Sequence, residues 1–160
     1  MKITRTILIL LLSVFMIGCS RNYAVNIDVK SADVLGQWSL ESAPPSVSKL
    51  LGTNASLSGF TLRSNGTAML QFFPLENFEP SAPQLGSRWS VVSQESKWGL
   101  RDWGDRGRHI WKLELETETR GIGLTVGKKA SGELVLAYTP DPDKDETVLF
   151  KRLEIKRQND

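Results

Sequence analysis

The sequence predicts an all-β protein, a single antiparallel up-and-down barrel of about eight strands with one short helix after the first strand. Beyond residue 32 the chain consists of short runs rich in β-branched and aromatic residues, and turn residues separate these runs at short intervals. The clearest run covers residues 109–117 and alternates apolar with charged side chains, which is the period of a strand with one buried face. Its apolar members are Trp111, Leu113 and Leu115, and its charged members are Lys112, Glu114 and Glu116. Strands that follow one another in a meander close most easily into a barrel, because closure removes the exposed edges.

The start of this domain carries the first strand and the helix. Residues 35–41 are predicted as a strand with Trp38 on its inward face. The next segment, residues 46–52, has the pattern of one short helix. Ser46 is expected to cap its N-terminus, and Gly52 to end it.

A hairpin follows the helix. Residues 57–63 and 67–73 are predicted as strands that flank Ser64-Asn65-Gly66. Asn and Gly tolerate the positive φ angles of a tight turn, so this triplet is a strong hairpin signal. The side chains predicted to point inward are Phe60, Leu62, Leu70 and Phe72.

The rest of the domain continues the meander. Residues 74–86 hold three of the seven prolines and are predicted as a loop. Turns are expected at 104–107 and 128–132. The strands predicted here are 88–93, 97–103, 109–117, 122–126, 134–138 and 147–153. Their inward residues, besides those of 109–117, are Trp89, Val91, Ile122, Leu124, Val126, Leu134, Leu136 and Tyr138.

The N-terminus resembles the signal peptide and lipobox of a bacterial lipoprotein. Lys2 and Arg5 precede an apolar run over 7–17, which fits a signal h-region and is shorter than the roughly 20 residues of a membrane-spanning helix. Met16-Ile17-Gly18-Cys19 follows, and Cys19 is the only cysteine of the chain. The resemblance implies a diacylglycerol on the Cys19 thiol and cleavage before it. The alternatives are an ordinary secretory signal and an uncleaved anchor.

This resemblance also implies a place and a set of boundaries. Ser20 after the cysteine favours an outer-membrane lipoprotein that faces the periplasm, by the sorting rule of that family. The expected organisation is a signal over 1–18, the lipidated Cys19 with a tether to residue 32, a barrel domain over 33–154 and a polar tail over 155–160. Two or three acyl chains anchor a protein stably, whereas a single chain binds reversibly.

Cleavage changes the charge of the protein. The full chain has 20 basic and 18 acidic residues, and removal of residues 1–18 takes away Lys2 and Arg5, which leaves 18 of each. The basic character of the precursor is therefore no sign of nucleic-acid binding.

Three short motifs of the barrel domain resemble those of lipocalins and related calycins. Leu35-Gly36-Gln37-Trp38 is similar to the G-x-W of the first lipocalin strand. Residues 62–67 resemble a hairpin common in small bacterial lipocalin-like domains, and residues 148–153 resemble the last strand of those domains. The resemblance covers roughly residues 33–153 and implies a lipocalin-like barrel whose interior could hold an apolar ligand, although some members have no known ligand. It also implies that a basic residue, Arg152 or Lys151, packs over Trp38 and closes the barrel.

The segment from Trp98 to Trp111 is the candidate binding site. Residues 97–112 contain five basic and two acidic residues in an otherwise neutral protein. Trp and Arg dominate protein interfaces, and they also stack on sugars and anionic head groups. Alternatively, Trp111 belongs to the core and the other residues decorate a hairpin. The candidate interface residues are Trp98, Arg101, Trp103, Arg106 and Arg108.

No catalytic or metal-binding constellation is predicted, and no cofactor is expected. His109 is the only histidine, and no serine lies in a nucleophile-elbow motif. A zinc site needs three or four ligands, which one His and a lipidated Cys do not supply. Residues 141–145 space three aspartates like a calcium loop, but Glu146 replaces the required Gly and Arg152 the last carboxylate, so a solvated turn is expected.

The sequence therefore predicts a non-enzymatic, lipid-anchored envelope protein that binds an apolar small molecule or an envelope protein. One alternative is an immunity or inhibitor lipoprotein that blocks a periplasmic hydrolase or effector with the loop at 97–108. Another is an accessory subunit of an outer-membrane assembly. The large inward side chains favour a filled interior over a ligand cavity.

Overall fold

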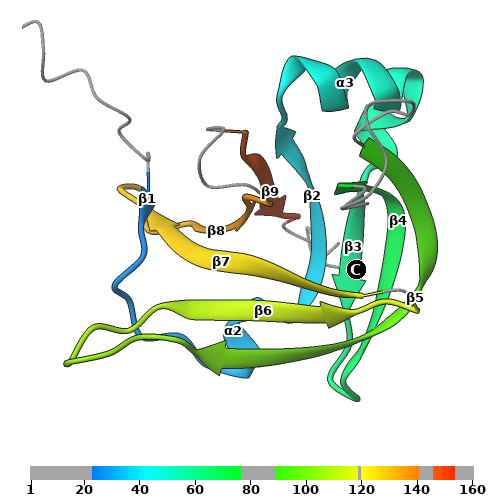
Figure 1. Cartoon of the computed structure of the whole chain (residues 1–160). Helices are drawn as coiled ribbons and strands as arrows, with labels where there is room; N and C mark the ends of the chain where they lie inside the picture. The colour runs from blue at the N-terminus through cyan, green and yellow to red at the C-terminus, as the bar shows by residue number, and fades with distance from the viewer. Residues whose placement is uncertain (1–22, 77–88, 119, 141–145, 154–160) are drawn as a thin grey trace, which may run out of the picture.

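The computed structural model describes residues 23–76, 89–118, 120–140 and 146–153. Within these residues nine strands form one sheet in the order β1-β7-β6-β5-β4-β3-β2-β9-β8, and β7 also pairs with β8 (Figure 1). Strands β2 to β9 therefore close into an eight-stranded barrel, and β1 is an addition to it. Every pairing is antiparallel, so the predicted fold class is confirmed. The strands are β1 Tyr23–Ala24, β2 Gly36–Ser42, β3 Gly59–Leu62, β4 Thr67–Glu76, β5 Trp89–Asp102, β6 Trp111–Glu116, β7 Gly121–Lys129, β8 Leu134–Tyr138 and β9 Val148–Arg152.

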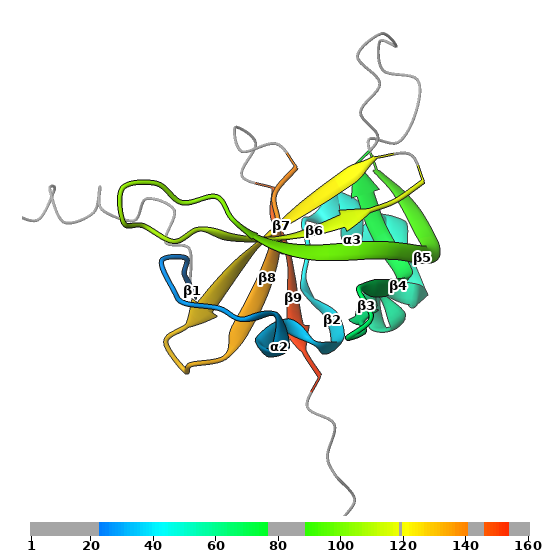
Figure 2. The same cartoon turned by 90° about the horizontal axis from the view of Figure 1, so that it is seen from below.

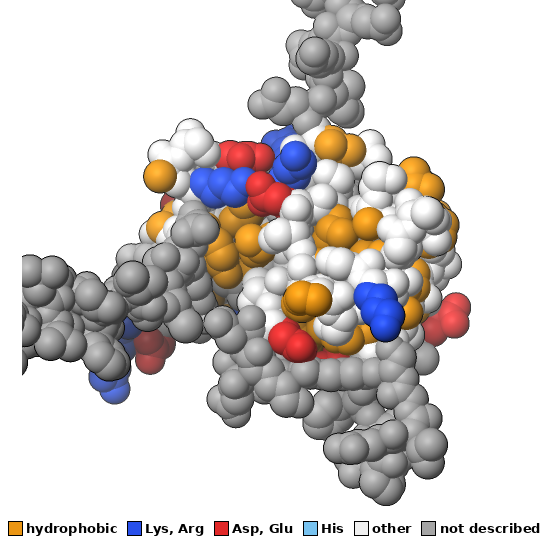
Figure 3. Space-filling view, turned by 90° about the horizontal axis from the view of Figure 1, so that it is seen from above, with side chains coloured by type: hydrophobic (Ala, Val, Ile, Leu, Met, Phe, Trp, Pro, Cys, Tyr) orange, Lys and Arg blue, Asp and Glu red, His pale blue; other side chains and the backbone are white. Residues whose placement is uncertain are grey.

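The predicted helix is present as α3, Pro45–Leu51, and a 3-10 turn, η1, Gly52–Leu57, continues it. It begins at Pro45, one residue before the predicted segment, and its N-cap residue lies two positions before the predicted cap. Pro44 rather than Ser46 is the N-cap residue, because Pro45 at the first helical position needs no backbone N–H partner. Val47 and Leu51 are buried, so α3 packs its apolar side against the barrel at the top of Figure 1. The surface seen from that side carries several separate hydrophobic patches and scattered charged groups (Figure 3).

The Asn-Gly hairpin between β3 and β4 forms as predicted. The Asn65 side chain accepts hydrogen bonds from the backbone N–H of Thr67 at 3.0 Å and from its hydroxyl at 2.8 Å. Gly66 has a φ of +80°, a conformation that favours glycine. The turn therefore sets the register that buries Phe60 and Leu62.

The prediction that Phe72 and Val91 point inward was wrong, because β4 contains a β-bulge. The register with β5 shifts between Leu70 and Phe73, and Phe72 has a φ of +44°. The extra residue reverses the alternation beyond it, so Phe73 is fully buried and Phe72 only partly. On β5, Val92 faces Phe73, whereas Val91, which was predicted inward, is 37% exposed.

Two predicted boundaries also change. The prediction of a loop from residue 74 was wrong at its start, because β4 runs through Glu76. The predicted strands 88–93 and 97–103 are one continuous strand, β5, in which Ser96 is buried and donates to the Glu116 carbonyl at 2.6 Å. Residues 77–88, which include the rest of the predicted loop, lie outside the described residues.

Aromatic rings fill the part of the barrel enclosed by β2, β3, β4, β8 and β9. Trp38, Phe60, Phe73, Tyr138 and Phe150 form a continuous cluster with ring centroids 5.2 to 6.3 Å apart. Each of these side chains is at most 5% exposed. Burial raises the pKa of Tyr138 above its ordinary value of 10.0. The cluster supports the prediction of a filled interior in this part of the barrel.

The N-terminal segment differs from the predicted tether. From Tyr23 onward it lies against the barrel, because β1 pairs with the end of β7 and the Tyr23 ring covers Gly127, where a Cβ would meet the ring at 2.2 Å. Val29 is 3% exposed and belongs to the core. The segment is held by a few long-range contacts, and its sequence has no strand or helix period that would predict them.

Several predicted features lie outside the described residues: the signal and Cys19, the aspartates of 141–145, and the tail 155–160. In the part of the chain that is described, no helix is long and apolar enough to cross a membrane.

Candidate functional site: the β5–β6 hairpin

The candidate segment forms the end of a long β-hairpin that leaves the barrel wall. Strands β5 and β6 pair from Lys97 opposite Glu116 to Asp102 opposite Trp111. The pairing of β6 with β7 begins only at Lys112. The hairpin therefore continues beyond the barrel, and both views show it projecting on the side where β1 lies (Figures 1 and 2).

One face of the hairpin carries four side chains in mutual contact, and we call Arg101, Trp103, Lys112 and Glu114 the outer hairpin face. Arg101 Nε lies 3.0 Å from a Glu114 oxygen, and Trp103 Nε1 donates to the other Glu114 oxygen at 3.1 Å. Lys112 Nζ lies 5.3 Å from the Trp103 ring centroid, which is a cation–π distance. Trp103 is 60% exposed. A large aromatic side chain is thus held in one orientation while most of it faces solvent.

The tip of the hairpin is basic. Arg106 and Gly107 have positive φ angles of +48° and +81°, and Arg108 N–H donates to the Asp105 carbonyl at 2.9 Å. Arg106 and Arg108 are both exposed. We call these two arginines the basic tip.

Trp98 does not share this surface. Its indole N–H donates to the Arg63 carbonyl at 2.9 Å, and its backbone N–H donates to the Gly66 carbonyl at 2.9 Å. The side chain is partly buried against the core. Four of the five predicted interface residues therefore lie on the projecting hairpin, and Trp98 instead ties β5 to the β3–β4 turn.

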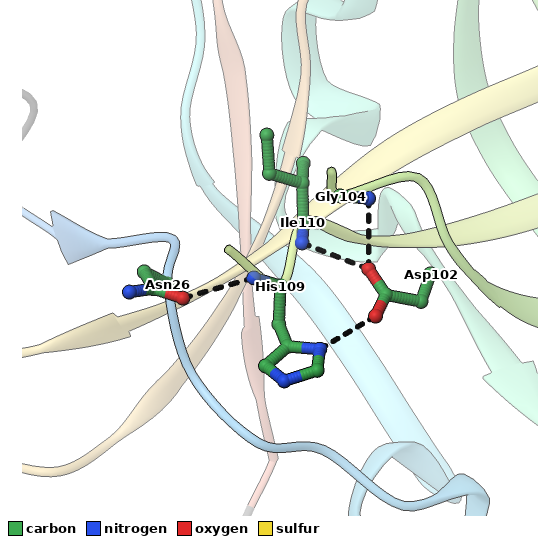
Figure 4. A network of polar contacts seen from close by, with 5 residues as sticks. All are labelled: Asn26, Asp102, Gly104, His109 and Ile110. Carbon is green, nitrogen blue, oxygen red and sulfur yellow. Dashed lines mark hydrogen bonds and ion pairs between the residues drawn. The ribbon is translucent and has the colours of Figure 1, made fainter. Parts of the chain in front are cut away.

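The inner face of the hairpin holds a polar network around Asp102 (Figure 4). The His109 ring nitrogen Nδ1 lies 2.6 Å from one oxygen of Asp102. The other oxygen accepts from the backbone N–H of Gly104 at 2.8 Å and of Ile110 at 3.0 Å. The Asn26 side chain accepts from the His109 backbone N–H at 2.9 Å. The Asp102 carboxylate thus holds the turn together, and the hydrogen bond from His109 to Asn26 attaches the N-terminal segment to the turn.

The pair shifts both pKa values in the direction that favours the charged forms. The hydrogen bond from His109, with help from the Gly104 N–H, lowers the pKa of Asp102. The hydrogen bond to Asp102 raises the pKa of His109. The His109 ring also stacks on Trp111, with centroids 6.5 Å apart. The His109 side chain is 55% exposed and the Asp102 side chain is 31% exposed, so water reaches the pair that holds the turn.

Sequence reasoning missed two contributors, Glu114 and Asn26. Glu114 was detectable, because the two-residue period of the hairpin places 112 and 114 on the same side as 101 and 103. Asn26 gives no such signal, since it lies 83 residues from His109 in sequence.

Of the residues predicted to close the barrel, Trp38 and Arg152 lie directly opposite each other on β2 and β9, whereas Lys151 lies opposite Ser39. Trp38 is 1% exposed, and its indole N–H donates to the Val34 carbonyl of α2, Ser31–Val34, at 2.8 Å. Arg152 Nη1 donates to the Asp33 carbonyl of the same helix at 3.2 Å. Both residues attach α2 to the junction of the first and last barrel strands.

Among the described residues, no group of three or more His, Cys, Asp or Glu side chains is placed to hold a metal ion. The outer hairpin face and the basic tip carry an exposed indole, guanidinium groups and a lysine, which can make cation–π contacts and charged hydrogen bonds.

No protein-family model matches this chain, and neither a curated protein nor a solved structure matches it.

Proposed function

We propose that this protein is a non-enzymatic binding protein of the cell envelope, anchored in the outer membrane through lipidated Cys19, whose outer hairpin face binds a partner protein. The observation that carries the proposal is Trp103, a tryptophan that is 60% exposed and fixed by Glu114 and Lys112. Aromatic and Arg side chains held ready for contact are typical of interface hot spots, since little conformational entropy is lost on binding.

The aromatic cluster inside the barrel supports a protein partner over an apolar ligand. Phe60, Phe73 and Phe150 pack against one another with centroids 5.2 to 5.9 Å apart in the middle of the core. A ligand in that part of the barrel would have to displace these rings. The outer hairpin face is available without any rearrangement.

The test is recovery of a partner from solubilised envelopes with the full-length protein as bait. Trp103→Ala should weaken binding about 30-fold or more, the effect of losing a hot spot worth about 2 kcal/mol. Met69→Ala is the matched control, because Met69 is a 39% exposed apolar side chain on β4, outside the hairpin. Equal recovery by Trp103→Ala and the unchanged protein would remove the outer hairpin face as the binding surface.

The nature of the recovered partner separates the alternatives. A periplasmic hydrolase or effector would identify an inhibitor or immunity protein, and a component of an outer-membrane machine would identify an accessory subunit. Anchoring is tested separately: Cys19→Ala should release the protein from the membrane fraction or leave it unlipidated there, as read by intact-protein mass.

A further inference from the structure

The N-terminal end of the described structure lies on the side of the molecule from which the hairpin projects. The chain enters at Tyr23, and β1 pairs Tyr23 with Lys129 and Ala24 with Lys128. Two residues further on, Asn26 accepts the hydrogen bond from His109, next to the basic tip. Both views place β1, the β7–β8 turn and the hairpin on this side, with α3 on the far side (Figures 1 and 2).

The length of chain between Cys19 and this surface limits its distance from a membrane. Tyr23 is four residues from Cys19 and Asn26 is seven. At about 3.5 Å per residue these segments span at most about 14 Å and 25 Å. If the lipid of Cys19 is in the bilayer, the end of the hairpin that contacts Asn26 is held close to the headgroups.

The charges on this side suit an anionic surface. Within the described part of the chain, Arg106, Arg108 and Lys128 are exposed and take part in no ion pair. By contrast, Lys129 contacts Glu41 and lies 3.2 Å from Glu133.

Some of the acidic groups on the same side form ion pairs with neighbouring residues. The Asp102 carboxylate is paired with His109, and Glu133 with Lys129. Asp28 and Asp105 also lie in these segments and reduce the net positive charge. Arg106, Arg108 and Lys128, which form no ion pair with the described residues, nonetheless lie at exposed positions, at the tip of the hairpin and the end of β7.

We infer that the basic tip and Lys128 form a membrane-facing surface that binds the phosphates of anionic lipid headgroups and orients the barrel on the bilayer. This inference rests on the lipid anchor of the proposed function. Basic residues near an anionic membrane each strengthen the attraction about fivefold, so three of them bias the orientation of a molecule already held there. The outer hairpin face would then be presented at a constant height above the membrane.

The test uses the full-length lipidated protein in nanodiscs of phosphatidylcholine, with or without phosphatidylglycerol, and a headgroup spin label. The amide signals of residues 105–108 and of Lys128 should broaden when phosphatidylglycerol is present, and those of α3 should not. Raised salt should reverse the broadening, because ions screen the attraction. The double change Arg106→Gln and Arg108→Gln should weaken docking about 30-fold, whereas Arg63→Gln, on the β3–β4 turn, should leave it unchanged.

The possible failures are distinguishable. Protein held in the disc without broadening at the tip, or with broadening that does not depend on phosphatidylglycerol, would overturn the headgroup surface while the anchor stands. Protein that does not associate with the disc would overturn the anchor, and this inference with it. Both arginines are exposed, so their replacement should not alter the unfolding temperature, which is checked first.

Discussion

Asp102 is the residue that holds the hairpin turn together, because its two oxygens contact three different groups. One oxygen pairs with His109, and the other accepts the Gly104 and Ile110 backbone N–H groups. The hydrogen bonds from the Gly104 and Ile110 backbone do not depend on protonation of the His109 ring, whereas the charge attraction between Asp102 and His109 does. The turn should therefore loosen, but not open, when His109 loses its proton.

Asp102→Asn should lower the pKa of His109 toward its ordinary value of 6.5, because the variant loses the negative hydrogen-bond acceptor. Titration of the His109 ring signals by NMR measures this. Asp105→Asn is the control, since Asp105 shares the turn but does not pair with the ring in the described structure. An unchanged His109 pKa in Asp102→Asn would show that the pair is not formed in solution.

The same pair gives the hairpin a defined pH dependence. The pKa of His109 is raised on folding, so its contribution to hairpin stability is complete below about 6.5 and is lost as the pH rises through the raised value. The pKa of Asp102 is lowered, so its contribution is present above about 3.8 and is lost as the pH falls through the lowered value. Amide hydrogen exchange over 103–110, corrected for intrinsic rates, should be slowest between these limits.

Adjacent phenylalanines of the β4 bulge should differ sharply in their effect on stability. Phe73→Ala removes a fully buried ring and should lower the free energy of unfolding by about 3–5 kcal/mol. Phe72→Ala should cost clearly less, because Phe72 is only partly buried. Chemical denaturation of the two variants measures both values, and equal losses would contradict the register shift.

At the scale of elements, the N-terminal segment is part of the folded domain. β1 lies on the stretch of β7 that β6 leaves when the hairpin departs from the barrel, so it covers an otherwise open strand edge. α2 closes the barrel beside the β2–β9 junction through the hydrogen bonds to the Val34 and Asp33 carbonyls. Both elements precede the first barrel strand, yet they contact strands that come much later in the chain.

Gly127→Ala should detach β1 without unfolding the barrel. The added methyl group would meet the Tyr23 ring at 2.2 Å, so the ring must move. We expect a loss of about 1–3 kcal/mol and faster proteolysis within the N-terminal segment. Gly123→Ala on the same strand is the matched control, since its methyl group would meet only the Lys112 side chain at 3.8 Å. Equal resistance of both variants to protease would contradict the packing of Tyr23 on β7.

At the scale of the whole molecule, the last strand completes the core as well as the sheet. Phe150 of β9 contacts Phe60 of β3 and Phe73 of β4, with centroids 5.2 and 5.3 Å away. The pairing of β9 with β2 and β8 closes the barrel. Closure and ring packing therefore stabilise each other, and unfolding should be cooperative.

Phe150→Ala should lower the free energy of unfolding by about 3–5 kcal/mol, and tryptophan fluorescence and far-ultraviolet circular dichroism should report the same transition. Lys151→Ala, an exposed neighbour on the same strand, should change stability by no more than about 0.5 kcal/mol. Two separate transitions in the unchanged protein would contradict a single cooperative core.

The sequence by itself determined the features that depend on neighbouring residues. The Asn65-Gly66 turn, the helix near 46–52 and the inward positions of β6 and β7 follow from local conformational preferences and from a period of two. Those features are enough to define an all-β meander of about eight strands. They also marked the hairpin that carries Arg101, Trp103, Arg106 and Arg108.

The tertiary structure decided what depends on contacts between distant residues. The bulge that exchanges Phe72 for Phe73, the hydrogen bond from the Trp98 indole to the Arg63 carbonyl, and the docking of Asn26 on His109 are examples. Each results from a competition for burial or for a hydrogen-bond partner that forms only when the barrel closes. Local patterns cannot predict such contacts, because their energy comes from residues brought together by the fold and not by the sequence.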